Sequence, residues 1–244
     1  MFAIGITFCW HVVSNAKEAP QEPVARPSYQ QFKDDNLKNL MNDFPSQNSK
    51  QFWQVLRAAI KRILTEEDPK YPAILLFAIP KDPSASLTGS CLAHHLTHQL
   101  NVFHGLENKA FIDIDKDLTH KSAAGDKKEL DEKLINLYGV RESKGVAVDH
   151  FEKLSPMASL LFHGYCDGDH APYKNVSMVL VLHTDINQDN ILTNKSAVDD
   201  FLQNLWAKEL DGDKIPPLIS RIANNVAIVT PEDEHSIRKL CPWL

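Results

Sequence analysis

Hydrophobic positions along the chain gather into five short apolar runs, and the segments between them carry apolar residues at helical spacing. The most apolar run, residues 73–79 (AILLFAI), has no polar residue on either face, which is typical of a strand buried on both sides of a sheet. Strands that alternate with helices predict an α/β fold, a three-layer sandwich around a mainly parallel five-stranded sheet with right-handed crossovers. The predicted strands are residues 73–79, 110–114, 145–151, 176–183 and 225–229.

Helices are predicted where apolar residues recur every three or four positions. Ser46 is expected to cap the first long helix, and Lys61 and Arg62 near its end favour a helix C-terminus. The predicted helices are residues 47–64, 90–100, 125–138, 197–209 and 216–223.

The chain divides into three parts by composition. Residues 1–13 (MFAIGITFCWHVV) are apolar but shorter than the roughly 20 residues that a membrane helix needs. We interpret them as a partial transmembrane or signal-like segment, which would deliver the rest to a secretory lumen, with a buried strand as the alternative. Residues 14–34 hold three prolines and no periodicity, which predicts a linker, and residues 35–244 are expected to form one domain.

Charge and cysteine content narrow the functional classes. With 26 Lys and Arg against 32 Asp and Glu, the net charge is −6, so the composition does not favour nucleic acid as a partner. The four cysteines form no CxxC pair, which argues against a zinc ribbon or a thioredoxin-type motif. Cys91 and Cys241 could close a long loop as a disulfide in an oxidising lumen or remain two buried thiols, and the residues alone leave both options open.

Two Asn-X-Ser tripeptides are N-glycosylation acceptors if the chain is lumenal. Asn194 lies in a polar segment and is expected to be the one that is used. Asn175 begins an apolar run and is expected to lie too close to the sheet.

The segment after the first strand has the position of a nucleotide-binding loop but lacks its residues. A P-loop needs a glycine at its start and Gly-Lys-Ser/Thr at its end. Here Ser84 replaces the first glycine, and the end reads Gly89-Ser90-Cys91. Ser90 brings no positive charge to the phosphates, and Cys91 is a poor ligand for Mg²⁺. The pattern therefore predicts a loop before residue 90. We interpret it as a vestigial P-loop, and no nucleotide is expected as a cofactor.

A second vestigial motif ends the third predicted strand. A Walker B strand ends in an Asp that helps to hold Mg²⁺, followed in AAA+ ATPases by a Glu that activates water. Asp149 is present, but His150 occupies the Glu position, and His183-Thr184 close the next strand where AAA+ proteins carry an Asn-type sensor. Together with the altered P-loop, these substitutions argue against ATP hydrolysis by this chain.

Three histidines on one predicted helix raise the question of a metal. His94 and His98 have the i, i+4 spacing of a zinc pair. The general base of the HExxH motif is absent, because His95 stands in its position. These residues are expected to be surface or packing histidines, and no metal site is predicted.

Arg221 lies on a short predicted helix just before the last strand. In AAA+ rings an arginine at this place reaches into the ATP site of the neighbouring subunit and stabilises charge on the γ-phosphate, an effect worth roughly 10³–10⁵ in rate. The alternative is a surface arginine that interacts favourably with the end of its helix.

Several stretches together resemble the torsin-interacting proteins, membrane-anchored activators of torsin ATPases in the nuclear envelope and the ER. The matching stretches are LMNDFPSQ, PAILLF, FEKLSPMASLLFHGYCD, LWAKEL and the SRI that precedes the last strand. The resemblance covers residue 35 to the C-terminus and is of the lamina-associated polypeptide type.

The resemblance implies a degenerate AAA+-like large domain that binds no nucleotide and lacks the C-terminal helical lid. Members dock beside an ATP-bound torsin-type ATPase in a ring-like assembly, and the arginine finger falls on Arg221 by position. A disulfide between Cys91 and Cys241, and a place in the ER lumen or perinuclear space as a single-pass membrane protein, are also implied. Only fifteen residues follow Val229, which agrees with a missing lid.

Three hypotheses for function follow. The first is a non-enzymatic ATPase activator that supplies Arg221 in trans. The second is a divergent nucleotide hydrolase that uses Asp149 and His150, and the third is a structural, membrane-associated scaffold.

Overall fold

A central parallel sheet organises the computed structural model, which describes residues 29–107, 109–119 and 121–244. The strand order is β2-β3-β4-β1-β5, and all neighbouring strands run parallel. The strands are β1 (Ala73–Ile79), β2 (Phe111–Asp113), β3 (Gly145–Asp149), β4 (Ser177–His183) and β5 (Val226–Ile228). All five predicted strands and the parallel three-layer architecture are confirmed.

Strand β1 lies inside the sheet, which explains its unbroken apolar sequence. It pairs with β4 along its whole length, from Ala73 opposite Ser177 to Ile79 opposite His183, and with β5 on its other side. Every residue of β1 is buried. Alternate side chains of this strand therefore enter two separate hydrophobic cores, one on each face of the sheet.

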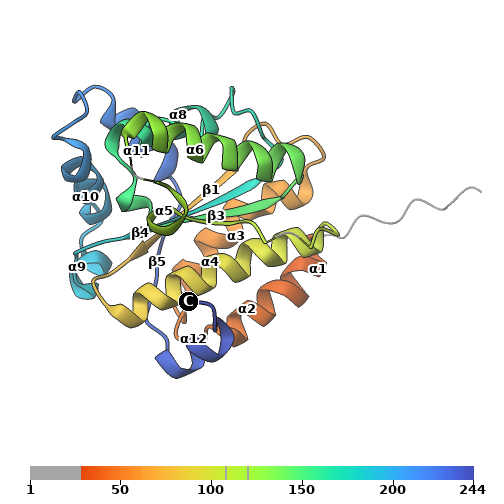
Figure 1. The fold of residues 1–244 in the computed structure, drawn as a ribbon. Coiled ribbons are helices and arrows are strands. Elements are labelled where there is room, and N and C mark those ends of the chain that lie inside the picture. The colour runs from red at the N-terminus through yellow and green to blue at the C-terminus, as the bar shows by residue number, and fades with distance from the viewer. Residues whose placement is uncertain (1–28, 108, 120) are drawn as a thin grey trace, which may run out of the picture.

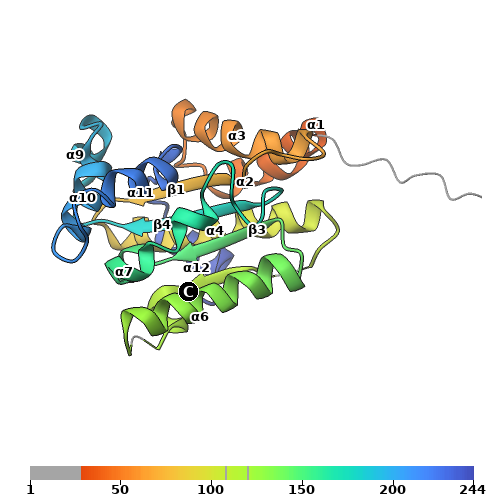
Figure 2. The ribbon, with the colours of Figure 1, turned by 90° about the horizontal axis from the view of Figure 1, so that it is seen from above.

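Two layers of helices cover the two faces (Figures 1 and 2). One face packs against α1 (Tyr29–Gln31), η1 (Phe32–Leu37), α2 (Lys38–Asp43), α3 (Lys50–Thr65), α4 (Pro83–Phe103) and α12 (Glu234–Leu240). The other packs against α5 (Ile114–Asp117), α6 (Ala123–Ile135), η2 (Asn136–Val140), η3 (Phe151–Lys153), α7 (Pro156–Ser159), α8 (Phe162–Tyr165), α9 (Gln188–Thr193), α10 (Ala197–Trp206) and α11 (Ile215–Ile222).

The N-terminal boundary of the folded part differs from the predicted one. Residues 29–34, predicted as the end of the linker, are helical and continue through η1 into α2. Phe32 is fully buried, and its ring meets Phe103 edge-to-face at 5.0 Å between centroids. A single anchoring aromatic in a polar stretch leaves no periodicity, so the pattern did not reveal this segment. The apolar segment 1–13 lies outside the described residues, and none of the described helices is long and apolar enough to cross a membrane.

Helix α3 begins three residues later than predicted, and Ser46 does not cap it. The Ser46 amide donates to Glu232 Oε1 at 2.8 Å, and Gln47 exchanges hydrogen bonds with the backbone of Thr230. These residues hold the segment that follows β5 instead of starting a helix. The partners lie more than 180 residues away in sequence, so local spacing gave no sign of them.

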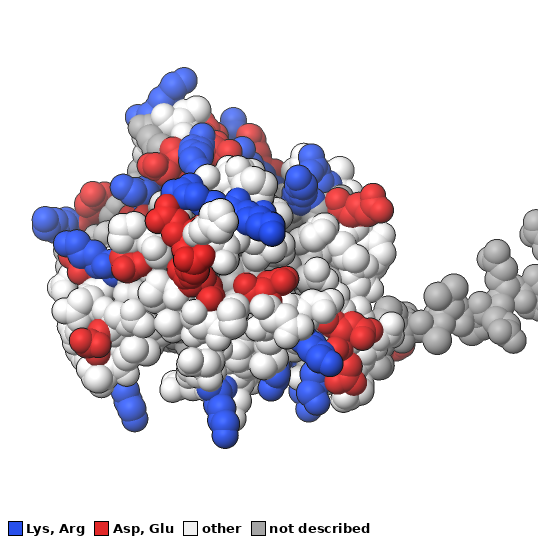
Figure 3. Space-filling model, turned by 90° about the horizontal axis from the view of Figure 1, so that it is seen from below, with Lys and Arg blue, Asp and Glu red and all other residues white. Residues whose placement is uncertain are grey.

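The surface carries charges of both signs. On the face seen in Figure 3, Lys and Arg side chains are interspersed with Asp and Glu and form no continuous basic patch. Such a mixed surface provides no single-sign field that would steer a polyanion to this face.

Candidate functional site

The carboxyl end of β1 leads directly into α4, and this corrects the predicted loop. Helix α4 begins at Pro83, so Ser84, Gly89, Ser90 and Cys91 all lie within its first turns. Asp82 caps the helix by accepting a hydrogen bond from the Ala85 amide at 2.8 Å. Asp before Pro is a strong start signal for a helix, and it outweighs the Ser and Gly residues that suggested a loop.

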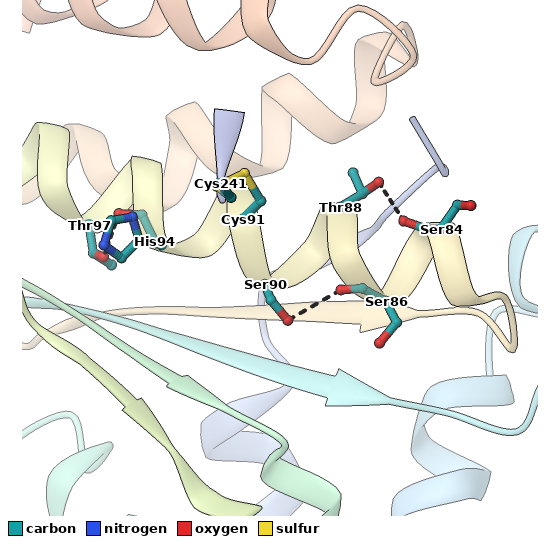
Figure 4. The surroundings of a disulfide bond; sticks show 8 residues. All are labelled: Ser84, Ser86, Thr88, Ser90, Cys91, His94, Thr97 and Cys241. Atoms are coloured by element: carbon teal, nitrogen blue, oxygen red, sulfur yellow. Dashed lines mark hydrogen bonds between the residues drawn. A yellow bond between two sulfur atoms is a disulfide. The ribbon is translucent and has the colours of Figure 1, made fainter. Parts of the chain in front are cut away.

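The start of α4 already engages backbone groups that a bound phosphate would need. A P-loop offers free backbone amides to the phosphates, whereas here the Ala85 amide bonds the Asp82 carboxylate and the Ser86 amide bonds the Asp82 carbonyl. The Asp82 carboxylate occupies the N-terminus of the helix, where a bound anion would sit. Thr88 donates its hydroxyl to the Ser84 carbonyl at 2.6 Å and Ser90 to the Ser86 carbonyl at 3.2 Å (Figure 4).

Gly89, the remnant of the P-loop signature, serves close packing of α4 on β1. A Cβ atom at this position would collide with the side chain of Ile79, which is itself fully buried. The absence of a side chain thus lets the helix approach the sheet, a role unrelated to phosphate binding.

Polar side chains meet where β3 and β4 end, and they pair with one another. Asp149 Oδ1 lies 2.8 Å from His183 Nε2, and Ser86 Oγ from α4 lies 2.9 Å from His183 Nδ1. Glu152 accepts a hydrogen bond from the His183 amide at 3.0 Å. Burial opposes ionisation of Asp149, but the hydrogen bond and charge of His183 outweigh it and lower the pKa of this carboxyl.

His150 completes this group. Its backbone is left-handed, with φ 54° and ψ 43°, a conformation that non-glycine residues rarely adopt. The His150 ring stacks on the His183 ring with centroids 4.2 Å apart, and its Nδ1 lies 3.2 Å from Glu152 Oε1. The hydrogen bond to Glu152 raises the pKa of His150.

A disulfide joins Cys91 on α4 to Cys241 just after α12 (Figure 4). The Cα atoms are 5.9 Å apart, and 150 residues separate the two cysteines in sequence. Helix α12, which the pattern did not reveal, brings Cys241 to α4 and buries Ile237 in the same core. The remaining described cysteine, Cys166, is a buried thiol whose pKa is raised by burial.

The three histidines of α4 lie beside this disulfide and serve packing. The His94 ring lies 4.5 Å from that of Trp243 and 5.8 Å from that of Phe111. Burial lowers the pKa of His94 to about 4. His94 is therefore neutral at physiological pH and contributes to the packing of the chain end.

Arg221 lies at the opposite, amino edge of the sheet, near the end of α11. Its guanidinium donates to Asp167 Oδ2 at 3.0 Å and to the Pro217 carbonyl at 3.0 Å. The side chain is 32% exposed, so it is not enclosed by the core. It borders a pocket of about 350 Å³ whose lining residues include no Asp or Glu.

Two residues of this pocket were not singled out as functional by the sequence. Arg62 at the end of α3 stacks its guanidinium over the Tyr71 ring, 3.8 Å from the ring centroid. The sequence marks Arg62 only as a residue near a helix end, and no motif singles out Tyr71. Their proximity to Arg221 comes from packing of α3 and α11 around the start of β1, which no local pattern encodes.

Asp167 pairs with Arg221 without lining the pocket, and the sequence did not single it out either. In the sequence it lies in the acidic stretch YCDGDH. Backbone hydrogen bonds from His170 and Asp169, together with the Arg221 guanidinium, hold its pKa well below the usual range. Asp167 thus remains ionised and fixed as the partner of Arg221.

The two glycosylation candidates differ in accessibility. Asn194 is exposed at the end of α9, and its Oδ1 accepts hydrogen bonds from Ser196. Asn175 is half-buried next to β4, and its Oδ1 is enclosed.

Comparison with known proteins identifies a matching family and several relatives. A family model described as "Lamina-associated polypeptide 1, AAA+ activator domain" matches residues 10–241. Torsin-1A-interacting protein 1 of Bos taurus is 30% identical over 229 residues, which cover 87% of this chain and 36% of that protein. The proteins of the same name from Homo sapiens and Mus musculus are 26% and 27% identical, over 86% and 96% of this chain. The chain spans less than two fifths of the length of these relatives, 37% of the human and 39% of the mouse protein.

Proposed function

The chain belongs to the family of the lamina-associated polypeptide 1 AAA+ activator domain, and we propose that it is a non-catalytic activator of a torsin-type AAA+ ATPase. It docks beside the ATP-bound partner in a hetero-oligomeric ring and supplies Arg221 as an arginine finger. It binds no nucleotide of its own.

One observation carries the proposal. A partly exposed arginine borders an open pocket on the amino edge of the sheet, while the polar groups on the carboxyl edge are engaged with one another. An ATPase needs free groups at the carboxyl edge, and an activator in trans needs a cation that a partner can reach. The partial exposure of Arg221 supports the second role.

The chemistry asked of Arg221 is electrostatic. In the transition state of phosphoryl transfer, negative charge spreads over the γ-phosphate oxygens, and a guanidinium placed there by a neighbouring subunit stabilises it. Arg221 exchanges its bond to Asp167 for these oxygens, and the bond to the Pro217 carbonyl helps to orient the side chain. Arg62, held over Tyr71, adds positive potential in the same pocket.

The compartment follows from the same proposal. We place the domain in the ER lumen or perinuclear space, attached as a single-pass membrane protein through the N-terminal segment. The Cys91–Cys241 disulfide supports an oxidising compartment, since such bonds are rare in the cytosol. Asn194 is the expected glycosylation site because it is exposed.

The test measures phosphate release by a torsin-type ATPase with and without the purified chain. Wild type should stimulate turnover, and Arg221→Ala should bind the ATPase in a pulldown yet lose about 10³-fold or more of the stimulated rate. Arg238→Ala is the matched control, because this exposed arginine pairs with Glu234 of its own helix, at 2.8 Å. Equal stimulation by the Arg221 variant and wild type would remove the finger role.

The two rival hypotheses are decided with the same protein. A hydrolase that uses Asp149 and His150 would bind Mg-ATP, so the midpoint of thermal unfolding would rise with millimolar Mg-ATP. The activator is expected to show no such rise. A purely structural scaffold would leave the turnover of the ATPase unchanged at every concentration of the chain.

A further inference from the structure

Asp149, His150 and His183 bring three metal-binding side chains together at the carboxyl edge of the sheet, and no role in activation uses them. One ligand atom from each residue lies within 4.8 Å of those of the other two. They come from the ends of two adjacent strands, β3 and β4, so the sheet itself sets their spacing. We propose that these three residues form a binding site for a zinc-type divalent metal ion.

The hydrogen bonds around the two imidazoles favour this use. Histidines that bind metal through one ring nitrogen almost always bond a carboxylate, hydroxyl or carbonyl through the other. His150 Nδ1 faces Glu152 Oε1 at 3.2 Å, and His183 Nδ1 faces Ser86 Oγ at 2.9 Å. His183 Nε2 is thereby directed to Asp149 Oδ1, 2.8 Å away, and His150 offers a ring nitrogen within 4.8 Å of the ligand atoms of both.

Charge and burial support a cation in this place. The Asp149 side chain is 2% exposed and the Glu152 side chain is 13% exposed, so two carboxylates lie together away from solvent. Lys116 forms its ion pair with Asp113 rather than with either of these carboxylates. Nitrogen ligands select zinc-type ions over Mg²⁺, which prefers oxygen. The ion takes the place of the Asp149–His183 hydrogen bond, and Ser86 Oγ then accepts a hydrogen bond from the Nδ1–H of His183.

A small rearrangement closes the site. Ligand atoms around a tetrahedral zinc ion lie about 3.3 Å apart, because each bond is about 2.0–2.1 Å long. The His150 and His183 rings are stacked, 15° from parallel, so one of them must turn toward the ion. His150 is the one that turns, since its side chain is 26% exposed against 14% for His183. Its left-handed backbone, which costs free energy, holds the side chain at this edge.

The experiment titrates the oxidised chain with Zn²⁺ by calorimetry and with Co²⁺ by visible absorption. Wild type should bind one equivalent and show the absorption of a tetrahedral site containing nitrogen ligands. His150→Asn, which tolerates the left-handed backbone, and His183→Gln should each weaken binding at least tenfold. Ser86→Ala should weaken it about tenfold, the effect typical of an outer hydrogen-bond partner.

The controls separate this site from the histidines of α4. The single variant His95→Ala should bind as wild type does, because the disulfide keeps Cys91 and Cys241, the two cysteines near His95, from binding metal. The double variant His94→Ala/His98→Ala should also bind as wild type does. Absence of binding by wild type would overturn the proposal. Undiminished binding by the folded His150 variant, or loss of binding in the α4 variants, would overturn it equally. The outcome is independent of ATPase stimulation.

Discussion

The two edges of the sheet differ in how their polar groups are satisfied. At the carboxyl edge, Asp149, His183 and Ser86 bond one another, and Asp82 closes the start of α4. At the amino edge, Arg221 borders a pocket and is held by a single carboxylate. At the carboxyl edge, where an ATPase holds nucleotide, the side chains thus pair with one another, whereas the partly exposed arginine lies at the other edge.

Secondary structure as well as residue type separates this segment from a P-loop. Even with lysine in place of Ser90, residues 84–91 would still lie within helix α4.

Removal of the disulfide that anchors α4 should cause the largest loss of stability. Cys91→Ser with Cys241→Ser should lower the free energy of unfolding by about 5 kcal/mol, because the crosslink closes a loop of 150 residues in the unfolded chain. Urea denaturation measures this loss, and reductant should reproduce it in wild type. Cys166→Ala is the control, since its response to reductant should equal that of wild type. A denaturation midpoint unaffected by the double substitution would contradict the covalent role.

Gly89→Ala should lower the free energy of unfolding by about 1–3 kcal/mol, because the new methyl group overpacks the contact with Ile79. Ile79→Val removes the atom nearest to the collision. The double variant should therefore lose less than the sum of the two single losses in a thermodynamic cycle. Additive losses would mean that the glycine serves something other than close packing.

Asp167→Asn should lower the concentration of chain that half-maximally stimulates the ATPase, by up to about fivefold. The reason is that Arg221 no longer has to break its ion pair with Asp167, and ion pairs near the surface are weak. The maximal rate should stay within about twofold of wild type if Asp167 only holds the finger between encounters. A fall in the maximal rate would instead assign Asp167 to positioning the guanidinium in the complex.

The pH dependence of stability should show the smallest effect. The folded-state pKa of His150 is raised above 6.5 by Glu152, so its stabilising contribution is fully present below pH 6.5 and is lost as pH rises through the folded pKa. His150→Asn should remove this loss, which thermal melts from pH 6 to 8 can measure. Histidines with a lowered pKa, such as His94 and His104, change stability in the opposite direction, because they make the folded state more stable as pH rises toward 6.5. They are present in wild type and in the His150 variant alike, so the difference between these two pH profiles reports His150 alone. An identical pH profile for both would contradict the Glu152 interaction.

The fold class follows from the local hydrophobic pattern. Five apolar runs became five parallel strands because strands covered on both faces are mostly apolar, and β1 is apolar at every position. The spacing also placed Asp149 at a strand end and Arg221 on the helix before β5, where the structure has them. These features depend on residues within one or two turns of one another.

Other features emerged only from the folded chain: Phe32 belongs to the core, and Asp167 and Arg62 lie beside Arg221. The tertiary structure also decided between a disulfide and two thiols, because α12 carries Cys241 to a helix 150 residues away. Each of these outcomes depends on contacts between distant segments, whose free energy leaves no periodic trace in the chain.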